Sequence, residues 1–200
     1  MHKKEIQSIG ERMFEGNRRY AAGLPPRADI SAQRRREVAV DQHPCAAVVA
    51  CSDSRVPVEH VFDLGVGDLF VVRIAGNVVG MHEAGSLEYA VKHLHVPLVL
   101  ILGHTNCSAV SAALSGNGTD GAIGSIIKKV MPAVNRTRAK SRGESGPEFL
   151  RAACIENIHQ ATADLYRFSP YIKAAADNGT VTVAGALYET ETGEVVGLDA

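Results

Sequence analysis

The chain has 200 residues, a length that suits one domain with a single sizeable core. Its 21 lysines and arginines nearly balance 22 aspartates and glutamates, so the formal net charge of -1 offers no field to attract nucleic acid or an anionic membrane. The longest apolar run, residues 96–102, is far shorter than the ~20 residues that span a bilayer, and residues 1–14 contain no apolar signal segment. We therefore expect a soluble, cytoplasmic protein whose partner is a small molecule.

The N-terminal segment is predicted to form an amphipathic helix with one apolar face that packs on a core or on a neighbouring subunit. Apolar side chains recur there at helical spacing among charged residues: Ile6, Ile9, Met13 and Tyr20. A turn at residues 23–26 precedes a basic stretch at residues 34–36, which we interpret as a solvated helix face. We expect a single domain over residues 1–200, with residues 1–36 as an N-terminal helical arm and residues 37–200 as an α/β core.

Three short apolar runs predict buried parallel strands: Cys45 to Cys51, Leu69 to Ile74, and Pro97 to Leu102. Each run is apolar on both faces, as strands between two layers of helices require. The segment from Glu83 to His95 has helical spacing and enough length for a crossover helix between parallel strands. This arrangement indicates a βαβ unit.

The second half of the chain continues the alternation of helices and strands. Residues 123–140 and 147–168 are predicted as long helices, residues 181–188 as a strand, and residues 194–198 as a strand that turns back along it. The predicted fold class is α/β: a mostly parallel central sheet, with four parallel strands and a C-terminal antiparallel strand, wrapped by helices.

Two of the predicted strands end in residues that bind metals. Cys51 closes the first strand, and His104 and Cys107 follow the third, so the three meet at one edge if these strands are neighbours. Zinc accepts thiolate and imidazole ligands, and three protein ligands leave the open fourth position that is typical of catalytic sites. The spacing alone is weak evidence, because His-x-x-Cys is a common pattern. Cys45 and Cys154 are interpreted as buried small side chains without chemistry.

Asp53 and Arg55 strengthen this interpretation. They follow Cys51 at alternate positions, so their side chains are expected on the same side. An aspartate beside a metal ligand can coordinate the ion or hydrogen-bond to a water on it, and a neighbouring arginine keeps that aspartate ionised. Elsewhere such a pair would be interpreted as a surface ion pair of little consequence. Beside Cys51, it favours a catalytic role.

The motifs around these residues closely resemble those of the β-class carbonic anhydrases: CSDSRVPVEHVFDLGVGDLFVVRIAGNVV, GSLEYAV and GHTNCSAV. The resemblance runs from residues 16–20 to residues 185–188 and is weakest between residues 116 and 146. It implies one zinc ion per chain on Cys51, His104 and Cys107. It also implies reversible hydration of carbon dioxide to bicarbonate and a proton, by attack of a zinc-bound hydroxide that an Asp53–Arg55 dyad orients.

The resemblance further implies a substrate pocket. Gln42 would hydrogen-bond the substrate, while Phe70, Ala75 and Tyr89 would line the apolar space that receives carbon dioxide. Ser108 stands where many members of the family have glycine; its backbone N–H would remain a donor to the substrate oxygen, but its side chain could alter substrate access. From the residues alone, Phe70 and Tyr89 would be interpreted as core residues.

One branch of the family is allosterically controlled by bicarbonate at a site with tryptophan, arginine and tyrosine. This chain resembles it at Arg73 and Tyr188 but has Val48 in place of tryptophan. We therefore place it in the ungated branch, marked by Gln42 and Tyr89, which implies a zinc ion open to water near neutral pH.

By the same resemblance, the expected assembly is a homodimer or tetramer in which the N-terminal helix embraces the partner and the active site lies at the shared interface. Three alternatives stay open. A relative with the same ligands could hydrolyse carbon disulfide or carbonyl sulfide. The chain could be a zinc-binding assembly module, or a nucleotide-binding α/β domain that uses Gly65 and Gly67, although the third glycine of that motif is missing.

Overall fold

The computed structural model describes residues 2–117, 120–141, 143 and 145–198. Its strands form one sheet in the order β2-β1-β3-β4-β5. Their bounds are β1 Ala46–Ala50, β2 Leu69–Arg73, β3 Leu98–His104, β4 Thr182–Tyr188 and β5 Val195–Leu198. β1 pairs in parallel with β2 and β3, β3 pairs in parallel with β4, and β5 runs antiparallel to β4. The predicted sheet of four parallel strands and one antiparallel strand is therefore confirmed.

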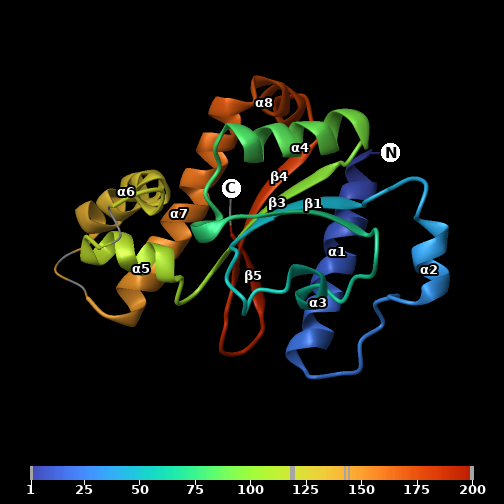
Figure 1. Ribbon diagram of the computed structural model, residues 1–200, viewed down its shortest axis with the longest axis horizontal. Coiled ribbons are helices and arrows are strands. Elements are labelled where there is room, and N and C mark those ends of the chain that lie inside the picture. The colour runs from blue at the N-terminus through green and yellow to red at the C-terminus, as the bar shows by residue number, and fades with distance from the viewer. Residues whose placement is uncertain (1, 118–119, 142, 144, 199–200) are drawn as a thin grey trace.

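The helices surround this sheet (Figure 1). Their bounds are α1 His2–Ala21, α2 Ala32–Glu37, α3 Val58–Val61, the 3₁₀ turn η1 Ala75–Asn77, α4 Met81–His93, α5 Ser108–Ser115, α6 Ile123–Lys140, α7 Pro147–Phe168 and α8 Pro170–Asp177. The long helices α6 and α7 have the bounds that the sequence predicted. Helices α3, α5 and α8 were not predicted, because helices of four to eight residues are too short for a repeating apolar pattern. Within the described part of the chain, no helix is both long and apolar enough to cross a membrane.

The two faces of the sheet are covered by different helices, as Figure 1 shows. Val48 and its alternate neighbours pack in one hydrophobic cluster with residues of α1 and α3. Val49 and its alternate neighbours pack in a second cluster with residues of α4 to α8. Side chains alternate across a strand, so a sheet buried on both faces needs the unbroken apolar runs found in this sequence.

Helix α1, predicted as part of an N-terminal arm, packs against the sheet and α3 of its own chain. Met13 is buried against the sheet, and the buried Asn17 amide donates hydrogen bonds to the backbone oxygens of Val61 and Gly193. A Cβ atom at Gly16 would lie 1.9 Å from the backbone oxygen of Phe62, so only glycine permits this close approach. The position of α1 is thus set within the chain.

The glycines at 65 and 67 do not open a helix. They lie in the loop between α3 and β2, and a Cβ atom at Gly65 would lie 2.4 Å from the backbone oxygen of Asp29. A nucleotide-binding loop of this kind would lead from a strand into a helix N-terminus. Here the loop leads into a strand, so the glycines serve chain packing and the nucleotide-binding alternative is not supported.

Candidate metal centre

The candidate ligand residues meet because their strands are neighbours. Ala50 of β1 is in register with Leu102 of β3, so Cys51 and His104 leave the sheet at the same carboxyl edge. Cys107 follows as the residue that caps the N-terminus of α5. The two sulfur atoms and the histidine nitrogen lie within 4.8 Å of one another, and all three side chains are buried. The predicted convergence is present.

The chemistry of His104 fits a metal ligand. Its Nδ1 lies 2.8 Å from the backbone oxygen of Thr105, which assigns the ring proton to Nδ1 and leaves a free lone pair on Nε2. That Nε2 is buried and has no hydrogen-bond partner among the described residues. A buried polar atom without a partner is costly, and a metal ion would supply the missing interaction.

The two cysteines also fit a cation between them. A hydrogen bond from Cys107 lowers the pKa of the Cys51 thiol, and the N–H of Gly76, 3.2 Å from the sulfur, acts in the same direction. The same contact with Cys51 raises the pKa of Cys107. Two adjacent thiolates repel each other, so full deprotonation of the pair requires a positive ion. A Cys-His-Cys set of donors is typical of zinc.

Asp53 and Arg55 lie beside this cluster as a tightly paired dyad. Arg55 donates from Nε to Oδ1 at 2.9 Å and from Nη2 to Oδ2 at 2.8 Å, and its backbone N–H donates to Oδ1 at 3.0 Å. The side-chain hydrogen bonds from Arg55 hold the pKa of Asp53 well below its usual range. Asp53 Oδ2 is 3.9 Å from His104 Nε2. The carboxylate is therefore ionised and borders the position that a metal would occupy.

Arg73 also belongs to this site, although no sequence pattern indicated that it supports the backbone here. It ends β2 opposite Ala50, and its guanidinium donates to the backbone oxygens of Cys51 at 3.1 Å and of Asp53 at 2.6 Å. These bonds fix the backbone that carries the first ligand and the dyad. In the sequence, Arg73 stood out only for its place at the end of a predicted strand and for the match to the allosteric branch noted above.

The expected substrate residues fall into two groups. Ala75 and Ser108 are exposed and adjoin the metal cluster, since Ala75 precedes Gly76 and Ser108 follows Cys107. Phe70 is in register with Ala47, which lies about 13 Å along the strand before Cys51 at ~3.3 Å per residue.

Tyr89 lies with Phe70, their ring centroids 6.4 Å apart, and the exposed Gln42 precedes the amino end of β1. Within a single chain, the sheet therefore places Gln42, Phe70 and Tyr89 at the opposite end from the Cys-His-Cys donor group.

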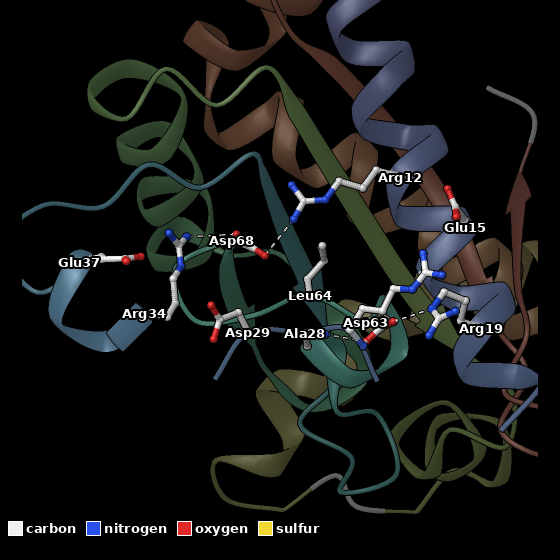
Figure 2. A pocket seen from close by; sticks show the side chains of 12 residues that line it. Arg12, Glu15, Arg19, Ala28, Asp29, Arg34, Glu37, Asp63, Leu64 and Asp68 are labelled. Atoms are coloured by element: carbon white, nitrogen blue, oxygen red, sulfur yellow. Dashed lines mark hydrogen bonds and ion pairs between the residues drawn. The ribbon is translucent and has the colours of Figure 1, made fainter. Parts of the chain in front are cut away.

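A separate polar cavity of about 440 Å³ lies beside α1 and α2 (Figure 2). Three ion pairs line it: Arg12 with Asp68 at 3.0 Å, Arg19 with Asp63 at 3.1 Å, and Arg34 with Asp68 at 3.3 Å. Arg34, expected on a solvated face, is in fact half-buried and also donates to a backbone oxygen in the loop before β2. These pairs anchor the N-terminal helices α1 and α2 to the loop between α3 and β2. Neither cysteine nor histidine is among the residues that line the cavity.

A parallel α/β sheet with a Cys-His-Cys donor set and a carboxylate–guanidinium dyad at its carboxyl edge defines a candidate metalloenzyme. The family model described as carbonic anhydrase matches residues 46–195. Carbonic anhydrase 2 of Mycobacterium tuberculosis is 38% identical over 188 residues, which cover 91% of this chain and 87% of that protein.

Two solved structures agree with this assignment. A Coccomyxa β-carbonic anhydrase in complex with acetazolamide is 31% identical with a TM-score of 0.75, over 82% of this chain and 75% of that one. The β-carbonic anhydrase CafA of Aspergillus fumigatus is 30% identical with a TM-score of 0.75, over 84% and 83% of the two chains. The chain belongs to the β-carbonic anhydrase family, whose activity is the hydration of carbon dioxide to bicarbonate.

Proposed function

We propose that this chain catalyses the reversible hydration of carbon dioxide with one zinc ion held by Cys51, His104 and Cys107. The observation that carries the proposal is the convergence of these three buried donors within 4.8 Å around a His104 Nε2 that has no partner among the described residues. When bound, zinc lowers the pKa of a water ligand to ~7 and so supplies a nucleophile near neutral pH.

Asp53 is proposed to orient that nucleophile. As an ionised carboxylate next to the donor residues, Asp53 would accept a hydrogen bond from a nucleophile at this site and so hold it in a fixed orientation. Arg55 occupies both carboxylate oxygens, which favours an Asp53 that stays off the metal. This arrangement supports assignment to the ungated branch.

The substrate pocket is proposed to form between two copies of the chain. Ala75 supplies an apolar wall and the N–H of Ser108, at the start of α5, a donor to the substrate oxygen. The partner subunit's Gln42, the partner subunit's Phe70 and the partner subunit's Tyr89 would complete the pocket.

Two features of the chain support such a homodimer, which could pair further into a tetramer. β2 is an edge strand, so its outer hydrogen-bonding groups are available to another chain. Near the amino end of the sheet, Val40 is 99% and Tyr89 48% exposed. Apolar side chains left open beside an unpaired edge are typical of an interface.

The test is a stopped-flow assay of carbon dioxide hydration, with zinc content measured on the same sample. We expect about one zinc per chain and a hydration rate that disappears when the zinc is removed with a chelator and returns when it is restored. A folded, zinc-loaded protein without hydration activity would instead support the assembly-module alternative. Parallel assays with carbon disulfide and carbonyl sulfide would identify a changed substrate range at Ser108.

A further inference from the structure

Asn157 of α7 contacts the turn beside the Cys-His-Cys donor group. Its side chain is 1% exposed, and its Nδ2 donates a hydrogen bond of 2.7 Å to the backbone oxygen of Gly76. Gly76 in turn donates its N–H to the sulfur of Cys51 at 3.2 Å. We propose that Asn157 is a positioning residue that sets the geometry of Cys51 through Gly76. The proposal rests on the zinc site proposed above.

The turn that Asn157 holds has an uncommon backbone conformation. Gly76 has φ +68° and Asn77 has φ +43°, so two successive residues occupy the left-handed region. A residue other than glycine rarely adopts this backbone conformation, so the conformation of Asn77 persists only where the surroundings enforce it. Inside the turn, the Asn77 N–H donates to the Ile74 oxygen at 3.0 Å. The amide of Asn157 adds a side-chain hydrogen bond from another element.

The two backbone groups of Gly76 are therefore fixed from opposite sides. Its N–H is committed to Cys51, and its C=O is committed to Asn157. The two bonds together limit rotation about both backbone torsions of Gly76, because each holds one flanking peptide plane. Loss of the Asn157 amide would let the turn relax and withdraw the N–H from the sulfur.

Close packing of α7 on the sheet brings Asn157 to this position. The next residue, Ile158, lies over Gly103 and Gly185, where added Cβ atoms would come within 2.5 Å and 2.8 Å of its side chain. One turn earlier on α7, the buried Cys154 packs in the same hydrophobic cluster as Cys107. The helix thus packs behind both cysteines and bonds to the turn beside Cys51 through Asn157.

The test compares Asn157→Leu, which keeps a similar volume but removes the donor, with Thr137→Val as a matched control. Thr137 is also buried, and its hydroxyl donates to the Ala133 oxygen at 3.0 Å within α6. Zinc affinity is measured by competition with a chelator, and the thiolate-to-metal absorption band is recorded after replacement of zinc by cobalt(II). We expect zinc binding about 10- to 100-fold weaker in Asn157→Leu, the usual effect of losing a residue that orients a ligand, and an altered cobalt band.

Thr137→Val should keep wild-type zinc affinity even if its melting temperature falls as much. Equal zinc affinities and cobalt spectra in the two variants would overturn the proposal. If Asn157→Leu does not fold, Asn157→Ala, which removes the amide donor without adding bulk, is measured in its place with the same expectation. Failure of the wild-type protein to bind zinc would refute the proposed function itself, so the two failures are distinguishable.

Discussion

The guanidinium of Arg55 contacts both carboxylate oxygens of Asp53, at 2.9 Å and 2.8 Å, in a planar two-point contact. A third bond runs from Arg55 Nη2 to the backbone oxygen of Asn106, next to Cys107. The dyad is therefore connected to the loops of the first and third ligands. A lysine ammonium is a single point charge and cannot reproduce this fork.

Arg55→Lys should therefore lower activity without removing the metal. Asp53 would keep a nearby positive charge but lose its fixed orientation, so we expect the hydration rate to fall about 100-fold, within the range for loss of a positioned proton-transfer group. Stopped-flow assays with zinc analysis on the same sample measure both quantities. Asp53→Asn should show a similar loss at full zinc occupancy. Near-wild-type rates for either variant would contradict the role of the dyad.

Cys107→Ala should abolish zinc binding, because it leaves only one thiolate and one imidazole. We expect zinc content to fall from about one ion per chain to near zero, with carbon dioxide hydration lost in parallel. Cys45→Ser is the matched control: Cys45 lies at the opposite end of β1, and its thiol donates to the Asp68 oxygen, a bond that serine can keep. Elemental analysis after gel filtration decides the outcome, and zinc retained by Cys107→Ala would refute the ligand assignment.

A shared active site should allow two inactive chains to restore each other. Asp53→Asn disables the metal side of a site, and Gln42→Ala disables the substrate side. If the partner subunit's Gln42 completes each site, a mixed dimer contains one intact site, and an equimolar refolded mixture should recover about a quarter of wild-type activity by random pairing. Each variant refolded alone is the control. No recovery in mixtures shown to contain mixed dimers would place Gln42 in the site of its own chain or outside it.

Asp63→Asn should weaken the fold in a pH-dependent way. Burial raises the pKa of Asp63. Hydrogen bonds from the backbone N–H of Ala28, from the Arg19 side chain and from the backbone N–H of Arg27 together lower it by more, so the pKa lies below its usual value. A depressed pKa stabilises the fold above the unfolded value of about 3.9, and this stabilisation is lost as the pH falls through the folded value.

We therefore expect Asp63→Asn to cost about 1–3 kcal/mol of unfolding free energy at pH 7 and less at about pH 3, which lies below the unfolded-state pKa. Asparagine tolerates the left-handed φ of +49° at this position, so backbone strain does not confuse the comparison. Urea unfolding at both pH values measures the difference, and Asp177→Asn, at an exposed pair with Lys173, is the control. A cost that is equal at both pH values would mean that the charge of Asp63 is not responsible.

Strong local patterns made much of the fold predictable. Apolar runs marked β1, β2 and β3, and the long periodic segments marked α6 and α7, because burial leaves a signal in the sequence that is continuous along a strand or repeats along a helix. The short helix α5 leaves no such signal, although it begins at Ser108, directly after a predicted ligand. The supporting contacts of Arg73 and Asn157 were also hidden, since each bonds to a backbone oxygen and backbone atoms carry no sequence identity.

Apolar runs and residue types along the chain predicted the kind of sheet, the three candidate donor residues and the carboxylate–guanidinium pair, because these signals can be read from local segments and motifs. The pairing of β1 with β3, which brings Cys51 to His104 and Cys107, could be seen only in the folded chain. The fold also placed Phe70 and Tyr89 at the far end of the sheet. Strand order and register depend on how distant segments share one core, and no local pattern encodes that choice.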